Sequence, residues 1–313
     1  MLLEVVVLII GLVLLILGGD FLVKGASRVA LRFNVSSLVI GLTIVAFSTS
    51  APELLVSLNA AFKEAPDFAM GNVVGSNISN LALVLGVACL FGYIPIHKGT
   101  ATRDWLVTML ASILLYIFVL DEILTFSEGA ILFGMLIIYL IILLVKTKKD
   151  KIKLEYKIDP SQDTNFEKFK DVFLLLLGGA CLYFGSNWFI DGAADIATDL
   201  GVSQRIIGLT ILAIGTSLPE LFTSVIAAKK GETDLALGNL LGSNIFNVLS
   251  ILGITSMVHP LEVNKMIISS DMIWMLGITF AILPMMLLRN RLGRPSGIIL
   301  LVLYTTYIIF TLR

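Results

Sequence analysis

The hydrophobic positions of this chain form long apolar runs that polar segments separate. A run of about 20 residues is the length needed to cross the hydrocarbon core of a bilayer. Ten such runs predict ten transmembrane helices, near residues 2–23, 36–62, 68–92, 104–120, 126–145, 171–194, 203–228, 235–258, 267–288 and 296–312. The pattern therefore predicts an all-α polytopic membrane protein.

One long polar stretch, residues 146–170, divides the ten runs into two sets of five and contains eight lysines. The predicted organisation is a first five-helix unit over 1–145, a solvated linker over 146–170 and a second five-helix unit over 171–313.

The composition supports a chain that lies in a lipid bilayer. Of the 313 residues, 57% are hydrophobic and 14% are charged, and the mean hydropathy is +0.97. A soluble domain of this size cannot bury so many apolar side chains. The sequence has no basic face with interleaved aromatic residues, so it gives no indication of nucleic-acid binding. The sequence points to no cofactor and to no obligate protein partner.

The two halves are internal copies of each other. A shift of 167 residues, without gaps, aligns 18–86 with 185–253 and gives 32 identities in 69 positions. The matches include Gly, Pro, Asn, Ser and Glu, so shared hydrophobicity does not explain them, and a duplication does. Because five is an odd number, the second set of helices enters the membrane from the opposite side. The fold class predicted is thus ten transmembrane helices in two inverted five-helix repeats, an architecture of secondary transporters.

The basic residues predict the orientation. With the N-terminus outside, 18 of the 22 Lys and Arg residues fall on the inner side and 4 on the outer side, as the positive-inside rule requires. We therefore expect a multi-pass protein of the cell membrane whose N- and C-termini are extracellular and whose 146–170 linker is cytoplasmic.

Each repeat contains a buried acid in the same local motif, Thr-Ser-x-Pro-Glu. The acids are Glu53 and Glu220, and each lies inside an apolar run. An ionisable side chain at mid-membrane is costly and indicates a functional site. The preceding residues, Pro52 and Pro219, each remove one backbone donor. We expect the carbonyl groups that they free to face a cation, because such groups need partners in lipid.

A second motif, Gly-Asn-x-x-Gly-Ser-Asn-x-x-Asn, follows each acid. Its Asn, Ser and Asn recur every four residues and line one face of a helix with oxygen-bearing side chains; these are Asn72, Ser76 and Asn80, then Asn239, Ser243 and Asn247. Two interpretations of its glycines remain, close helix packing and local unwinding.

The chemistry of these residues is that of a hard-cation site. Carboxylate, amide, hydroxyl and carbonyl oxygens, without His or Cys, suit Ca²⁺, Na⁺ or K⁺. Two carboxylates neutralise one Ca²⁺, and in its absence their repulsion favours protons or monovalent cations, which is a physical basis for exchange. A channel would have a similar polar lining, but inverted repeats and paired buried acids favour a carrier. An intramembrane protease, the enzyme alternative, lacks the mid-membrane His of Ser-His chemistry, so we expect no enzyme.

These motifs resemble the calcium/cation antiporter superfamily, whose two inverted repeats carry similar segments. The matching segments are 49–53 with 75–77, and 216–220 with 242–244. The resemblance implies a secondary antiporter with alternating access, in which the first and sixth spans slide. It also implies that Glu53, Glu220 and the backbone carbonyls of Thr49 and Thr216 bind Ca²⁺. The other candidate ion-site residues are Ser50, Ser217, Ser76, Ser243, Asn77, Asn244, Asn80 and Asn247.

Two departures from the superfamily bear on the counter-ion. Ser48 replaces a glycine of the first motif, and Asn80 and Asn247 stand where sodium-using members often have an acid. With two formal charges rather than three, two protons are sufficient, whereas three Na⁺ would leave an uncompensated charge in a medium of low dielectric constant. The charge count favours H⁺ as the counter-ion for Ca²⁺. The Thr-Ser-x-Pro-Glu motifs resemble the sodium-using branch, so Na⁺ is the second candidate.

Overall fold

The protein is described from a computed structural model, which covers residues 2–63, 66–96, 100–149, 164–202 and 213–311. The elements of the first half follow the predicted spans, with short π-helices inserted. They are α1 (Leu2–Phe33), α2 (Ser37–Ile40), η1 (Gly41–Val45), α3 (Ala46–Phe62), α4 (Pro66–Ile78), η2 (Ser79–Val84), α5 (Leu85–Phe91), β1 (Ile94–Pro95), α6 (Thr100–Phe118), η3 (Val119–Asp121), β2 (Ile123–Leu124) and α7 (Phe126–Lys149).

The second half repeats this order from a long helix onward. Its elements are α8 (Asn165–Asp199), α10 (Ala213–Gly215), α11 (Leu218–Lys229), α12 (Thr233–Phe246), η6 (Asn247–Leu252), α13 (Gly253–Val258), β3 (Leu261–Glu262), η7 (Ile267–Asp271), α14 (Met272–Arg289), β4 (Arg291–Leu292) and α15 (Arg294–Thr311).

The all-α membrane class and its ten helices are confirmed. Within the described ranges, nine helices are long and apolar enough to cross a membrane. The remaining predicted span, 203–228, begins in residues 203–212, which lie outside the description, and ends as α10 and α11. Of the predicted linker, residues 150–163 also lie outside the description; α7 continues to Lys149 and α8 begins at Asn165.

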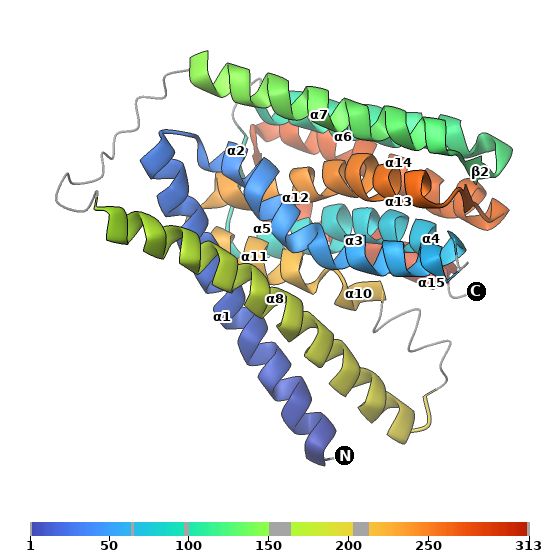
Figure 1. Cartoon of the computed structure of the whole chain (residues 1–313), viewed down its shortest axis with the longest axis horizontal. Coiled ribbons are helices and arrows are strands. Elements are labelled where there is room, and N and C mark those ends of the chain that lie inside the picture. The colour runs from blue at the N-terminus through green and yellow to red at the C-terminus, as the bar shows by residue number, and fades with distance from the viewer. Residues whose placement is uncertain (1, 64–65, 97–99, 150–163, 203–212, 312–313) are drawn as a thin grey trace.

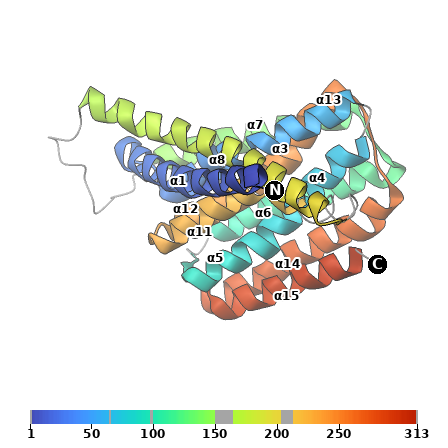
Figure 2. The ribbon, with the colours of Figure 1, turned by 90° about the horizontal axis from the view of Figure 1, so that it is seen from below.

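Helices α1 and α8 form an antiparallel pair that crosses the rest of the bundle obliquely (Figures 1 and 2). Glycines lie at their crossing points: a Cβ added to Gly18 would lie 2.9 Å from the carbonyl oxygen of Gly178, and one added to Gly11 would lie 2.8 Å from that of Gly185. The shift of 167 relates Gly11 to Gly178 and Gly18 to Gly185. The pair therefore obeys the internal symmetry, and its backbones are in close contact.

Both helices are longer than the apolar runs predicted. The prediction ended the first span at residue 23 and began the sixth at 171, where charged residues appear. In the structure those charges pair between the helices: Arg32 contacts Asp171 at 2.6 Å and Arg28 contacts it at 3.4 Å, and the Asp171 side chain is buried. The pairing offsets the cost of charge at this depth and lets both helices continue.

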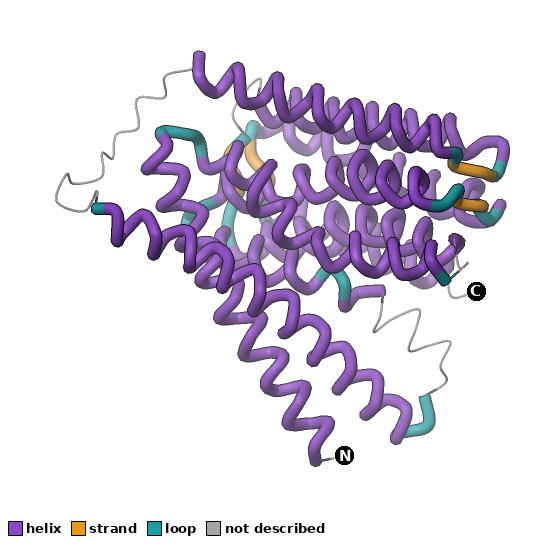
Figure 3. The backbone as a smooth tube through the Cα atoms, viewed as in Figure 1, coloured by secondary structure: helices purple, strands orange, loops and turns teal. Residues whose placement is uncertain are grey.

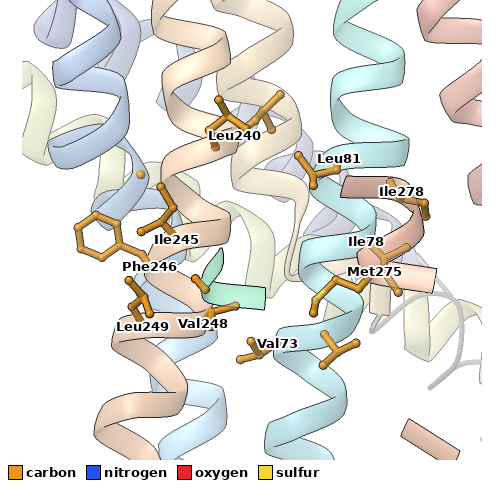
Figure 4. Close-up of a cluster of buried hydrophobic side chains, with 14 of the residues drawn as sticks. Val73, Ile78, Leu81, Leu240, Ile245, Phe246, Val248, Leu249, Met275 and Ile278 are labelled. Carbon is orange, nitrogen blue, oxygen red and sulfur yellow. The ribbon is translucent and has the colours of Figure 1, made fainter. Parts of the chain in front are cut away.

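The spans Pro66–Phe91 and Thr233–Val258 form the centre of the bundle, and the second is buried throughout its most apolar window. Figure 4 shows side chains from α4 and η2 (Val73, Ile78, Leu81), from α12 (Leu240, Ile245) and from α14 within one buried hydrophobic cluster. The motif-bearing helices of the two repeats are thus the most enclosed.

Four two-residue strands join the repeats at the ends of the bundle (Figure 3). Strand β1 pairs antiparallel with β4, and β2 pairs antiparallel with β3. Residues from Phe91 to Ile96 therefore lie at one face of the bundle. Residues from Asp121 to Leu124 lie at the opposite face. Asp67 also lies there, and its carboxylate accepts a hydrogen bond from the backbone N–H of Asn264 at 2.9 Å.

Candidate functional site

The two buried acids come together at the centre of the bundle. Glu53 lies on α3 and Glu220 in the first turn of α11, and neither side chain is exposed to solvent. Ser50, three residues before Glu53 on α3, donates a hydrogen bond to the Glu220 carboxylate at 3.3 Å, so the two acids lie in the same part of the bundle. The sequence prediction of paired mid-membrane acids therefore corresponds to one shared location.

The two prolines act differently. Helix α3 runs continuously through Pro52, preceded by the π-helix η1. In the second repeat the helix stops at Gly215, and Pro219 lies in the first turn of α11 after a turn at 216–217. The helix is therefore interrupted before the acid in the second copy, whereas the helix of the first copy is continuous. The residues at the equivalent position differ: Gly215 ends a helix in the second copy, whereas Ser48 lies within α3 and its hydroxyl donates to the Ile44 carbonyl at 2.7 Å.

Ser186 of α8 is a residue that the sequence reasoning missed. Its hydroxyl donates a hydrogen bond to the Gly215 carbonyl at 2.8 Å, so this freed carbonyl has a protein partner and does not face a cation as expected. The repeat equivalent of Ser186 is Gly19. A comparison of the two copies therefore could not single out Ser186.

Hydroxyl groups connect the two repeats around the acids. Thr49 Oγ1 lies 3.2 Å from Ser243 Oγ, and the symmetry-related Ser76 Oγ lies 3.5 Å from Thr216 Oγ1. Thr49 and Ser243 also lie beside the Glu220 carboxylate. The predicted Thr and Ser residues of each repeat thus meet those of the other repeat.

Four predicted asparagines form a second symmetric set. Asn80 Nδ2 donates to Asn244 Oδ1 at 3.2 Å, and Asn247 Nδ2 donates to Asn77 Oδ1 at 3.1 Å. Asn80 lies in the first turn of η2 and Asn247 begins η6. Single π-helical turns inside α-helices occur frequently at functional sites. The side-chain nitrogens of Asn80 and Asn247 each donate to the other repeat. Their side-chain oxygens accept no hydrogen bond from the described residues, so these oxygens are available to bind an ion.

The other asparagine of each motif holds its helix against the helix with the acid. Asn72 Nδ2 donates to Ser57 Oγ at 3.1 Å, and Asn239 Nδ2 donates to Ser224 Oγ at 3.0 Å. The prediction placed these residues on polar helix faces. The structure adds that the faces contact each other and position the acids.

Several buried oxygens of the predicted set have no hydrogen-bond partner among the described residues. They are both carboxylate oxygens of Glu53, Oε2 of Glu220, Oδ1 of Asn80, Oδ1 of Asn247 and Oγ of Ser217. A buried acceptor without a donor is destabilising by about 1–3 kcal/mol. Such oxygens are the ligands that Ca²⁺ and Na⁺ prefer, so a cation would satisfy them.

The remaining ligands of such a cation would be neutral. In the described ranges, no three side chains of the types His, Cys, Asp and Glu gather into one potential metal site. Among the described residues, the buried acids at this centre are Glu53 and Glu220. This agrees with the charge count made from the sequence.

A cavity of about 520 Å³ lies between this centre and one face of the bundle. Asn72, Ser76 and Thr216 line its inner part, and it extends to Asp67 and Asp271 near that face.

The glycines of the two repeats differ at this cavity. Gly71 and Gly75 line the cavity and have no neighbour that an added Cβ would touch; their equivalents Gly238 and Gly242 press on the backbone of α2 and η1. Helix packing is therefore confirmed for the second pair.

Comparisons with known proteins find matches along the whole chain. The sequence model of the family described as "Sodium/calcium exchanger protein" matches residues 3–145 and 170–313. The protein named "Putative antiporter CaxA", from Alkalimonas amylolytica, is 40% identical over 98% of both chains. "Sodium/calcium exchanger MaX1", from Methanosarcina acetivorans, is 31% identical over 97% of both chains.

Solved structures give the same similarity. The chain superposes on a structure of the sodium-calcium exchanger NCX_Mj with a TM-score of 0.86 and 33% sequence identity, covering 98% of each chain. The ten-helix, inverted-repeat arrangement is consistent with that structure.

Proposed function

The chain belongs to the sodium/calcium exchanger protein family, and on this premise we propose that it exchanges Ca²⁺ for a monovalent cation across the cell membrane by alternating access. The family is one of exchangers, which are transporters rather than enzymes; one relative is named an antiporter and another a sodium/calcium exchanger. The observation that carries the proposal is the pair of buried carboxylates, Glu53 and Glu220, with oxygens that lack hydrogen-bond partners.

The proposed Ca²⁺ ligands are the two glutamates with the backbone carbonyls of Thr49 and Thr216. Two carboxylates neutralise one Ca²⁺, which prefers six to eight oxygens, so neutral groups must complete the coordination. The proposed neutral ligands, which also serve the neighbouring monovalent sites, are Ser50, Ser217, Ser76, Ser243, Asn77, Asn244, Asn80 and Asn247.

The first candidate counter-ion is the proton. Two protons neutralise the two carboxylates directly, without a third charge. A protonated carboxyl is also a hydrogen-bond donor, so it can satisfy a neighbouring oxygen such as Asn80 Oδ1 or Asn247 Oδ1. Exchange of two protons for one Ca²⁺ leaves the net charge of the site unchanged in both loaded states.

Sodium is the second candidate, and two observations favour it. The relatives MaX1 and NCX_Mj are named as sodium exchangers. In addition, Asn80, Asn247 and Ser217 have neutral oxygens without partners, which suit Na⁺ as well as Ca²⁺. Two Na⁺ would neutralise the site as two protons do.

Movement of the α1–α8 pair across the rest of the bundle is the proposed route to alternating access. The pair has contacts with both α11 and α3, so it covers the site from one side. We further propose that residues 1–145 and 171–313 are the two repeats, that the 146–170 linker is cytoplasmic and that both termini are extracellular. The 18-to-4 distribution of basic residues supports this orientation.

Counterflow in proteoliposomes tests the antiport. Vesicles loaded with unlabelled Ca²⁺ should accumulate trace ⁴⁵Ca²⁺ above its equilibrium level, and release of Ca²⁺ should require a counter-cation on the other side. With the membrane potential held at zero by a K⁺ ionophore, a channel, the alternative with the same polar lining, would dissipate the gradient without counterflow. Calcium flux that needs no counter-cation would therefore overturn the proposal.

A further inference from the structure

Asp20 connects helix α1 to the end of helix α11. Lys230, the residue that follows α11, donates a hydrogen bond to one carboxylate oxygen of Asp20, and Lys24 contacts the other oxygen at 2.6 Å. Beside this contact α1 packs tightly on α11, because a Cβ added to Gly19 would lie only 2.7 Å from the Ile226 side chain. The ion pair thus joins the proposed moving helix to the central part of the bundle.

This ion pair lies on the opposite face of the bundle from the mouth of the cavity. Lys229, next to Lys230, lies 4.3 Å from the centre of the Phe91 ring, and Phe91 ends the span that begins at Pro66. The cavity reaches Asp67, at the beginning of that same span. In this structure the cavity therefore opens towards one face, and α1 is tied to α11 at the other.

The two repeats have different residues at this contact. The shift of 167 relates Lys230 to Lys63 and Asp20 to Asn187. Asn187 of α8 lines the cavity, and Lys63 is exposed where α3 ends, at the face to which the cavity opens. In inverted-repeat transporters one repeat rocks against the other about a fixed site. The opposite access state would accordingly bring Asn187 towards Lys63, and an amide cannot form an ion pair.

We propose that the ion pair of Asp20 with Lys230 is a latch that stabilises the state in which the cavity opens to the Asp67 face, and that the opposite state has no equivalent latch. The proposal rests on the alternating access proposed above. An interaction present in only one of two states shifts their ratio by its own strength. Because both side chains are about 30% exposed, we expect a shift of about 2- to 5-fold, the range measured for exposed pairs.

Side-specific labelling measures this shift. The reporter is Val56→Cys, which lines the cavity, in a background where Cys89 and Cys181 are changed to Ala. A cationic, membrane-impermeant thiol reagent is supplied on both sides of the membrane, so the orientation of the protein does not affect the result. Asp20→Asn and Lys230→Gln should each slow labelling, by up to about 2- to 5-fold, and the double variant should be no slower than either single variant.

Lys24→Gln is the matched control. Lys24 also contacts Asp20, at 2.6 Å, but both residues belong to α1, so their contact cannot hold α1 to α11. In this variant Val56→Cys should be labelled as fast as it is without the Lys24 substitution. Because Asp20→Asn and Lys230→Gln change the net charge in opposite directions, an electrostatic effect on the reagent cannot slow both.

The repeat supplies a second, independent variant. Asn187→Asp should create the missing latch with Lys63 and slow the labelling of Val56→Cys, and adding Lys63→Gln should restore the rate. A new carboxylate in the cavity would by itself attract the cationic reagent and speed labelling, so slower labelling has the opposite sign from that artefact.

The outcomes separate this proposal from the proposed function. Equal labelling rates in all variants, or additive effects of Asp20→Asn and Lys230→Gln, would overturn the latch, even if calcium exchange is intact. Labelling requires no transport, so a failure of calcium counterflow would overturn the antiport while leaving the latch result valid. The amount of labelled protein after full reaction in detergent gives the amount of each variant, by which its labelling rate is normalised.

Discussion

The Ser50 hydroxyl donates a hydrogen bond to Oε1 of Glu220 at 3.3 Å, although the two residues are 170 positions apart. The serine belongs to the motif of the first repeat and the acid to that of the second. The first repeat therefore supplies a hydrogen-bond donor to the carboxylate of the second, so that the candidate site forms only when both repeats are packed together. The predictions below follow from this shared site.

Ser50→Ala should weaken Ca²⁺ transport through its effect on Glu220. The change removes the donor to Oε1 and a proposed ion ligand, and hydrogen bonds to charged groups contribute about 1.5–3 kcal/mol. We expect the Ca²⁺ concentration at half-maximal flux to rise about 10-fold or more. Ser48→Ala is the control, because that hydroxyl donates only to the Ile44 carbonyl of its own helix. Equal effects of the two variants would contradict the assignment.

Glu53→Gln and Glu220→Gln should each nearly abolish Ca²⁺ flux in proteoliposomes. Either change removes an anionic ligand and leaves a single carboxylate for a divalent ion. Glu122→Gln serves as the control, because Glu122 is half-exposed and pairs with Lys265 at 3.2 Å, at the end of the bundle. Normal calcium flux in either variant of a buried glutamate would show that the central site is assigned wrongly.

The counter-ion is decided by imposing one gradient at a time. Proteoliposomes loaded with Ca²⁺ should release it under a pH gradient with no sodium present if protons are exchanged. Release that requires external Na⁺ and ignores pH would instead establish the second candidate. Asn247→Asp adds a carboxylate beside the site, and we expect it to increase the response to Na⁺ if the number of charges selects the counter-ion.

Single cysteines test the orientation. In a background lacking Cys89 and Cys181, an impermeant reagent should label Ser127→Cys, which is exposed at the start of α7, in intact cells. It should label Ser161→Cys, in the polar linker, only after the cells are opened. The reverse pattern would place the termini and the linker on the other sides of the membrane.

The repeat-related glycines Gly238 and Gly71 should differ in their tolerance of substitution. Gly238→Ala would force its new Cβ against the Leu38 carbonyl, whereas nothing lies within 4 Å of a Cβ at Gly71. Overpacking of this kind destabilises by typically 1–3 kcal/mol. Thermal unfolding in detergent should therefore show a lower midpoint for Gly238→Ala and an unchanged one for Gly71→Ala. Equal midpoints would show that the contact between α12 and α2 yields easily.

The sequence by itself determined the membrane class, the ten spans, the inverted duplication and the positions of Glu53 and Glu220. These features are readable because they depend on local properties. A run of apolar residues must match the thickness of the bilayer, and a duplication leaves the same residues at a constant shift. The family followed from motifs of the same local kind.

Only the tertiary structure decided which of these residues meet and which oxygens lack partners. The pairs of Asn80 with Asn244 and of Asn247 with Asn77 connect different repeats, and no local pattern specifies such contacts. The structure also separated the two copies: Gly215 ends a helix where Ser48 continues one, and Gly238 is packed where Gly71 lines a cavity. Nearly identical motifs take different conformations because each repeat packs against a different surface, and that surface depends on the whole fold.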